Sequence, residues 1–384
     1  MTSVTRTNVD GDFYNALDRS DTPPSLDEIQ WIVHADPGVT TRYVLLEDCQ
    51  TPLYRACLKE KVHSHVIDYL IAQWPDSVRL PEKHGDLPIH AACKNGLDIS
   101  VIKELVSRFP ESVGKKGSSL GTPLHFAAVA SLGTSGPSLE VVRFLHETYP
   151  EAIQEKDEEG SLPIHNAALA ADGIGEQNGV VRFIADAYPE SLLAEDDCGN
   201  LPLHCACGGG LQLSTVRFLV ELAPQSLHHR NKYGDLPLRW ALLNKSDASV
   251  QILDYLISLQ PDLHEPEILH WCYGDISAGN PLLVEYLIQK FPQCVQVQDE
   301  NGQIPLHKVA YLPFISKKFE LMKHAHVTML VDAYPEGLFV RASNGQTPLE
   351  ALLNRQCLEE TREFMEETMK DILSGSLKNS EVAF

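Results

Sequence analysis

The sequence has little positive charge and no long apolar run. Its 384 residues include 53 acidic and only 31 basic side chains, which gives a formal net charge of −22 at pH 7. A field of that sign repels phosphate backbones and anionic lipids, so we expect neither nucleic acid nor a membrane surface as a partner. It attracts basic or extended protein segments instead, although the same acidity also serves to keep a large surface soluble. No run of about 18 apolar residues is present, so no membrane-spanning helix is predicted.

The sequence also lacks a cysteine framework and catalytic motifs. Nine cysteines, an odd number, are scattered without paired spacing, which is unlike a disulfide-stabilised secreted domain and favours a reducing compartment, the cytoplasm or the nucleus. No C-x-x-C pair is available for a zinc site. Gly117 to Gly121 matches the G-x-S-x-G pattern of serine hydrolases, but no alternating strand pattern precedes it. We therefore expect no enzyme activity, no cofactor, no metal and no small-molecule substrate.

One phrase recurs along the chain, as LPIHAAC, TPLHFAA, LPIHNAA, LPLHCAC and IPLHKVA. Its copies are separated by 31 to 43 residues. Self-similarity at such a period is typical of stacked supersecondary units, each of which buries its apolar face only against its neighbours. Numbered on the fourth letter of the phrase, the anchor residues of the copies are Tyr54, His90, His125, His165, His204, Arg239, His270, His307 and Glu350.

Residues 83–113 illustrate one copy. Gly85 supplies a positive φ for a tight turn at no steric cost, and Pro88 fits the first position of a helix, where its missing N–H has no partner to lose. Small residues follow, which lets this short helix pack closely. An apolar stripe at helical spacing then begins at Val101 and stops at Pro110. Each unit is predicted to be a turn, a short helix, a longer helix and a return loop.

This order of turn, proline–histidine helix start and second helix resembles the ankyrin repeat, whose signature is T-P-L-H-x-A. The resemblance covers about residues 40 to 355. It implies an all-α fold, an ankyrin-type solenoid of stacked helix-turn-helix repeats with short hairpin-like loops. The sequence departs from the family in its longer period. It also ends its second helices in an aromatic–proline–glutamate triplet, as at Tyr149 to Glu151, where the family usually has Gly-Ala-Asp.

The resemblance also implies a domain organisation. We expect a single array of about nine to ten repeats over residues 11–373, with degenerate capping units at both ends to cover the apolar faces of the stack. Residues 1–10 and 374–384 are expected to be flexible. The copies depart most from the pattern near residues 239–272, so the array is either continuous or hinged there.

By resemblance, the chain is expected to be a non-catalytic protein–protein interaction scaffold that binds its partner on a concave face of loop tips and first helices. The alternative is an adaptor that recruits a client protein to an enzyme such as a ubiquitin ligase. Carried onto this sequence, the tip positions beside the turn glycines are His84, Asp86, Glu158, Glu159, Asp197, Lys232, Tyr233, Asp235, Glu300 and Asn301. The position after the anchor holds Arg55, Phe126, Asn166, Cys205, Trp240, Trp271 and Lys308.

Three aromatic residues in neighbouring copies are the expected centre of this binding face. They are Tyr233, Trp240 and Trp271, of the residue types that dominate binding energy at interfaces. The alternative is that the two tryptophans fill space left by irregular packing.

The repeated histidines are expected to be structural. In ankyrin arrays the imidazole at this position hydrogen-bonds the backbone of adjoining turns and ties neighbouring units together. The residues concerned are His90, His125, His165, His204 and His307.

Residues 311–326 form a basic insertion in an otherwise acidic chain. It is either a docking element or a lengthened helix with a solvated basic face. Its basic residues are Lys317, Lys318, Lys323, His324 and His326.

Overall fold

The protein is an all-α solenoid in the computed structural model, which confirms the expected fold class. The described residues contain helices, 3-10 turns and loops, with no strand. They divide into two compact units, Met1–Pro237 and Leu238–Phe384. The structure describes residues 25–35, 50–59, 62–129, 139–170, 177–209, 213–243, 249–260, 268–273, 281–312, 317–354 and 359–374. The tails expected at 1–10 and 374–384 lie outside these ranges, apart from Ser374, which ends the last helix.

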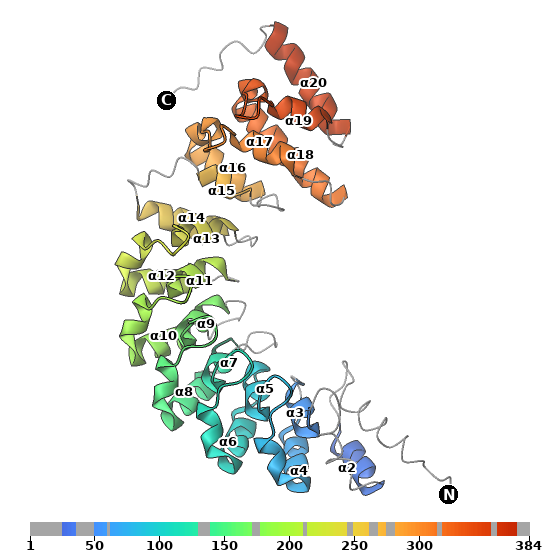
Figure 1. The fold of residues 1–384 in the computed structure, drawn as a ribbon, viewed down its shortest axis with the longest axis vertical. Coiled ribbons are helices and arrows are strands. Elements are labelled where there is room, and N and C mark those ends of the chain that lie inside the picture. The colour runs from blue at the N-terminus through green and yellow to red at the C-terminus, as the bar shows by residue number, and fades with distance from the viewer. Residues whose placement is uncertain are drawn as a thin grey trace, which may run out of the picture. The chain divides into compact units, whose positions relative to one another are not determined.

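In the first unit, short and long helices alternate along the chain and pack in two rows. After α2 (Leu26–Ala35), the short row consists of α3 (Pro52–Cys57), α5 (Pro88–Lys94), α7 (Pro123–Val129), α9 (Pro163–Leu169) and α11 (Pro202–Gly208). The long row consists of α4 (Ser64–Gln73), α6 (Ile99–Arg108), α8 (Leu139–Thr148), α10 (Gln177–Ala187) and α12 (Leu213–Leu222). Within this unit the stack curves, and the short row lies on the inside of the curve (Figure 1).

Each short helix starts at a proline, and the histidine anchor caps it. The Leu87 N–H donates to Nδ1 of His90 at 2.9 Å, so the imidazole pairs a backbone donor that the helix itself leaves unused. The same bond recurs at every other anchor histidine of the full motif. Where glutamate replaces histidine, Thr347 and Glu350 form a reciprocal capping box instead. At these five histidines and at Glu350, the anchor side chain therefore pairs the N-cap amide.

The second ring nitrogen of each anchor histidine ties its repeat to the next. Nε2 of His90 donates to the Lys115 carbonyl oxygen at 2.9 Å, and Nε2 of His204 donates to that of Asp235 at 3.1 Å. His125, His165 and His307 make the equivalent bond. Because Nδ1 already accepts a backbone N–H, these bonds assign the proton to Nε2. Both nitrogens of these five imidazoles are used, and the buried rings are neutral.

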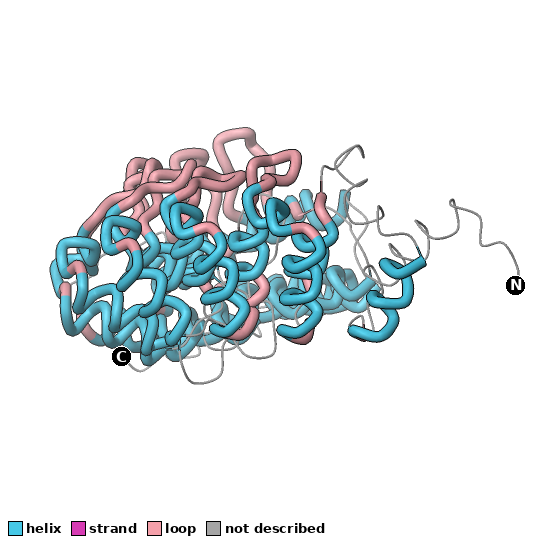
Figure 2. The backbone as a smooth tube through the Cα atoms, turned by 90° about the horizontal axis from the view of Figure 1, so that it is seen from below, coloured by secondary structure: helices cyan, strands magenta, loops and turns pink. Residues whose placement is uncertain are grey.

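Within the first unit, the turns that precede the short helices lie along one edge of the helical layers (Figure 2). Within a turn, the Asp157 N–H donates to the Ser161 carbonyl oxygen at 3.0 Å. Between turns, the Glu158 N–H donates to the Ser119 carbonyl oxygen at 2.8 Å, and that of Asp197 to Glu159 at 2.9 Å. At Gly160 (φ +71°) an added Cβ would lie 2.8 Å from the Asp197 backbone nitrogen. The turns from residues 117–121 to 231–235 are thus hydrogen-bonded to one another in series, and at Gly160 the close approach of the next turn leaves no room for a side chain.

The aromatic–proline–glutamate triplets start short 3-10 helices after the long helices. In the first unit, η4 (Pro110–Gly114), η5 (Pro150–Gln154) and η6 (Pro189–Leu193) start at such triplets. The 3-10 helices η3 (Pro75–Arg79) and η7 (Pro224–His228) also start at a proline, but aspartate and glutamine follow it there. A buried serine in the middle of several of them bonds back to the end of the long helix, as Ser77 Oγ does to the Trp74 carbonyl oxygen at 2.6 Å. The return loop of the predicted unit is therefore regular structure.

Cations stacked on phenylalanine rings link the long row. Arg143 of α8 lies over Phe183 of α10, with its Cζ 4.7 Å from the ring centroid, and Arg182 of α10 lies over Phe218 of α12 at 4.4 Å. Lys103 of α6 lies over Phe144 of α8 at 5.7 Å. Each contact joins one repeat to the next.

The second unit repeats the alternation. Its first row consists of α13 (Pro237–Leu243, which starts on the last residue of the first unit), α15 (Ile268–Trp271), α17 (Pro305–Tyr311) and α19 (Pro348–Asn354). Its second row consists of α14 (Ser249–Ser258), α16 (Pro281–Lys290), α18 (Lys317–Ala333) and α20 (Glu359–Ser374), with η8 (Pro292–Gln296) and η9 (Pro335–Phe339). His270 lacks the preceding proline, yet its Nε2 still donates to the Val297 carbonyl oxygen at 2.9 Å.

The basic insertion is described at residues 311–312 and at 317–326, the first part of α18, while the side chains of Lys317 and Lys318 lie outside the description. Its other three basic side chains do not form a solvated face. Lys323 is 2% exposed and donates from Nζ to the Leu312 carbonyl oxygen at 3.0 Å. His326 is fully buried beside the Tyr273 ring, and burial lowers its pKa to about 4. His324 is half-buried against Thr361. The lengthened helix is present, but these side chains pack inside the second unit.

Candidate functional site

A cavity of about 520 Å³ opens between three successive short helices of the first unit, α5, α7 and α9, and the two turns at residues 117–121 and 157–161. We call it the α7 cavity. Four of its lining residues are ones that the resemblance to ankyrin repeats selects: Phe126, Glu158, Glu159 and Asn166. The complete lining is Lys94, Ser119, Gly121, His125, Phe126, Val129, Asp157, Glu158, Glu159 and Asn166.

Three consecutive carboxylates of the turn at 157–161 line this cavity. Oδ1 of Asp157 accepts the backbone N–H groups of Glu159 and Ser161, at 3.0 and 2.8 Å, so Asp157 is held by its own turn. Glu158 and Glu159 are exposed, and their carboxylates have no hydrogen bond or ion pair with the described residues. Lys94 is the only cationic lining residue. The lining therefore carries an excess of two negative charges, with two carboxylates available to a ligand.

Phe126 supplies an aromatic wall in a fixed orientation. Its ring is half-buried and meets the His90 ring edge to face, with centroids 5.3 Å apart. The adjacent His125 is bonded on both sides, from the Thr122 N–H and to the Ser161 carbonyl oxygen. Asn166 on α9 lies next to the acidic turn, with its Nδ2 3.5 Å from Oδ2 of Asp157. Aromatic, amide and carboxylate groups thus face one space on a rigid frame.

The rim of the cavity holds an unusual backbone conformation. Leu120 has φ +54°, and no other described non-glycine residue has a positive φ. It stands where most other copies have the turn glycine, and its side chain is 52% exposed. Its neighbours Ser119 and Gly121 both line the cavity. The left-handed conformation costs a leucine about 1–2 kcal/mol relative to its preferred ones, and it keeps an apolar side chain in solvent at the rim.

The other predicted residues of the first unit are distributed over the tips and the short row. His84, Asp197 and Lys232 are exposed at turn tips, and Lys232 donates from Nζ to the Asp197 carbonyl oxygen at 2.6 Å. Tyr233 is 72% exposed and lies 3.7 Å from the Cys198 sulfur. Three others are more enclosed, namely Arg55 and Asp235, which are half-buried, and Cys205, which is buried.

Asp86 serves the frame of the first unit. It is buried, and its two oxygens accept the N–H of Ser118 at 2.7 Å and the hydroxyl of Ser118 at 3.0 Å. Both carboxylate oxygens are therefore engaged by the next turn.

The remaining predicted residues belong to the second unit. Trp271 is half-buried beneath Arg239, whose Cζ lies 5.4 Å from its ring centroid, and Trp240 is also half-buried. Lys308 pairs with Asp299 at 2.7 Å. Glu300 and Asn301 are exposed at a turn tip. Tyr233 belongs to the first unit, so the expected aromatic centre is divided between the two units.

Five lining residues were missed by the sequence reasoning, namely Lys94, Ser119, Gly121, Val129 and Asp157. For two of them, the spacing from the anchor gives a signal that could have found them. Lys94 and Val129 each stand four residues after a histidine anchor. The selected position comes one residue after the anchor, as at Phe126. Positions three apart in a helix share a face, so both positions of every short helix point to the same side.

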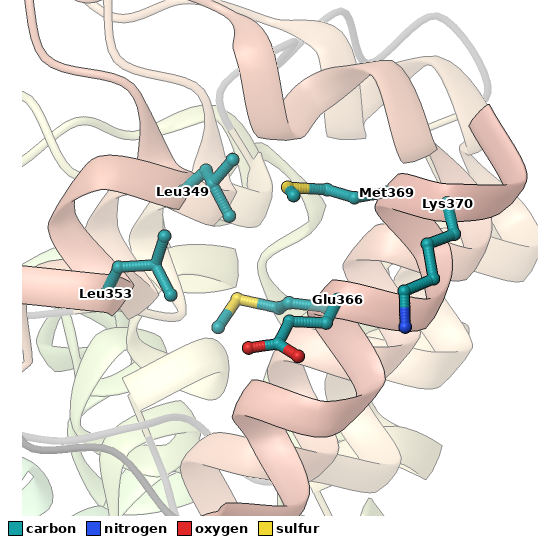
Figure 3. Close-up of a pocket in the computed structure, with 6 residues that line it drawn as sticks. Leu349, Leu353, Glu366, Met369 and Lys370 are labelled. Carbon is teal, nitrogen blue, oxygen red and sulfur yellow. The ribbon is translucent and has the colours of Figure 1, made fainter. Parts of the chain in front are cut away.

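A second cavity, of about 330 Å³, lies in the second unit between α19 and α20. Leu349 and Leu353 of α19 face Met369 of α20 across it, while Glu366 and Lys370 stand at its side (Figure 3). The lining of this second cavity is mostly apolar and contains no aromatic residue. Of the two cavities, the α7 cavity is the one that combines an aromatic wall with available carboxylates.

Comparisons with known proteins add no assignment. No family model matches the chain, and no curated protein is significantly similar to it. Among the described residues, no helix has the length and apolar character needed to cross a membrane, and no cluster of three or more His, Cys, Asp or Glu side chains could hold a metal ion.

Proposed function

We propose that the chain is a non-catalytic binding scaffold of the ankyrin type. Its partner is another protein, which docks on the turn tips and the short row of the first unit. The observation that carries the proposal is the α7 cavity, where residues selected by repeat position alone line one recess. Rigid helices and laddered turns support this recess, and such a pre-formed surface loses little conformational entropy on binding.

The state of the histidines supports binding over catalysis. A general base needs a free imidazole nitrogen within reach of a substrate proton. The anchor histidines of the first unit use Nδ1 to cap a helix and Nε2 to hold the next turn. Burial also lowers the pKa of His90 and His204. The anchor histidines therefore maintain the scaffold, and the side chains that differ from repeat to repeat are available for recognition of a partner.

The test compares partner recovery by matched variants. The full chain is immobilised and exposed to lysate of its source cells, beside Phe126→Ala. A control variant, Glu151→Gln with Glu190→Gln, alters exposed residues in η5 and η6 that do not line the cavity. Recovered proteins are quantified by mass spectrometry, and circular dichroism verifies that all three preparations are folded.

We expect one set of proteins to be recovered by the wild type and the control, and to be lost from Phe126→Ala. Recovery should also fall as salt rises, because an acidic face is screened over about 10 Å at 0.1 M salt. Equal recovery of proteins by all three preparations would show that the α7 cavity is not the site where partners bind.

A further inference from the structure

The α7 cavity has the chemistry of a receptor for one cationic side chain. We propose that it binds an arginine of the partner, next to an apolar residue that contacts Leu120. This inference rests on the proposed binding function and names the segment that the face recognises. Its recess of about 520 Å³ joins an aromatic wall to an acidic turn, which suits a side chain with an apolar stem, a flat cationic head and several donors.

The aromatic wall favours a stacked guanidinium. The Phe126 ring is held against His90 and half-exposed to the cavity. A cation over such a ring is stabilised by the ring quadrupole, and arginine is found there more often than lysine. The same chain uses this pairing internally, because Arg143 and Arg182 lie over phenylalanine rings at 4.7 and 4.4 Å, while Lys103 sits farther away, at 5.7 Å.

The acidic turn supplies acceptors for the head group. The carboxylates of Glu158 and Glu159 are exposed at the cavity without an ion-pair partner among the described residues. Asp157 is held by backbone N–H groups, so it fixes the turn and adds negative charge. A guanidinium presents five N–H donors in a plane and binds carboxylates in a bidentate manner, which a lysine ammonium does not.

Leu120 extends the site beyond the cation. Its side chain projects from a left-handed turn residue at the rim, 52% exposed. A glycine in its place relieves the backbone strain and removes the apolar side chain at the same time. Leu120→Gly should therefore make the protein more resistant to unfolding and also weaken binding, a combination that loss of fold cannot produce.

The experiment uses arrays of randomised octapeptides in which one position is fixed as arginine, lysine, leucine or citrulline, the neutral isostere of arginine. The full-length protein is applied at fixed concentration. The variants are Phe126→Leu, which keeps an apolar side chain but removes the ring, and Glu158→Gln with Glu159→Gln. The double variant Glu151→Gln with Glu190→Gln is the control with the same change in net charge.

We expect the fixed-arginine peptides to bind at least tenfold more strongly than the fixed-citrulline peptides and about threefold more strongly than the fixed-lysine peptides. Both cavity variants should lose most of the arginine preference, and the control should keep it. Leu120→Gly should weaken the binding of those arginine peptides that carry an apolar residue next to the arginine, and should have less effect on the others.

Two other outcomes overturn the inference, and they are distinguishable. If Phe126→Leu loses binding, but arginine and citrulline peptides bind the wild type equally, the proposed binding face would stand and the preference for a cationic side chain would be rejected. Binding that none of the cavity variants changes would reject the proposed function together with the inference.

Discussion

Acidification should loosen the scaffold through its anchor histidines, and His204 offers the sharpest test. Its Nδ1 accepts the Leu201 N–H and its Nε2 donates to the Asp235 carbonyl oxygen, at 3.1 Å each. Burial is the main cause that lowers the pKa of His204 to about 4, from an ordinary value of 6.5. Protonation of Nδ1 would point a second donor at the Leu201 N–H. The folded state therefore holds the neutral ring.

The sign and size of the effect follow from linkage. A histidine whose pKa is lowered by folding binds fewer protons in the folded than in the unfolded chain. Its contribution to stability is then present above pH 6.5 and is lost as the pH falls from there through about 4. At about 1.4 kcal/mol per pKa unit, the shift of His204 corresponds to about 3 kcal/mol in full, and to about 2 kcal/mol by pH 5. His90, His125 and His165 have pKa values shifted in the same direction by burial.

The assay has two parts. Histidine C2 hydrogen exchange, read peptide by peptide with mass spectrometry, gives the pKa of His204 directly, with exposed His84 as the control for label uptake. Urea unfolding at pH 7.5 and pH 5 then compares the wild type with His204→Gln, because glutamine can still accept the N-cap N–H. Between pH 7.5 and pH 5, the free energy of unfolding should fall by about 2 kcal/mol less in His204→Gln than in the wild type. A pKa of His204 near 6.5, or equal losses in both proteins, would refute the reasoning.

Three further predictions concern the turns and the long row. Gly234→Leu should lower the free energy of unfolding by about 1–2 kcal/mol through its positive φ alone, because an added Cβ meets nothing within 4 Å there; urea unfolding measures this, and no change would contradict it. Leu120→Gly should raise the same quantity by about 1 kcal/mol, since strain relief exceeds the added unfolded-state entropy, and a lower thermal midpoint would show that the left-handed residue is unstrained. Arg182→Met should lower the free energy of unfolding by about 0.5–1 kcal/mol by removing the cation over Phe218, and an unchanged free energy of unfolding would contradict a stabilising role for this contact.

The sequence predicted the repeat because its signals are local. Proline at the helix start, glycine in the turn and apolar spacing each act within a few residues, and the helices at Pro88 and Ile99 appear where these signals fall. The 3-10 helices were not predicted, although Pro75 and Pro110 begin them, because the proline was interpreted only as a stop. A proline ends the helix before it and fits the first position of the next one equally well.

The candidate site was predicted only in part. Repeat position selected Phe126 and Asn166, which are half-buried on the same face of α7 and α9, although Cys205 at the equivalent position of α11 is buried. It could not reveal that Asp86 is engaged by Ser118 or that Lys323 turns inward, because these contacts join residues 32 and 11 positions apart and depend on packing. Leu120 stands where most other copies have the turn glycine, and only the backbone shows that the left-handed turn is kept with leucine there.

The pairing in the long row has a direction. On α8, Arg143 reaches forward to Phe183, while its neighbour Phe144 receives Lys103 from behind. The helices α8 and α10 thus each present a cation to the following repeat and a phenylalanine ring to the preceding one, and these two edges are different surfaces. A head-to-tail contact of this kind leaves one unused edge at each end of the series, so the series can be extended by adding copies unless the rotation closes it into a ring. The length of such an array is then set by the number of repeats in the gene, and gain or loss of one whole repeat would leave the remaining junctions intact.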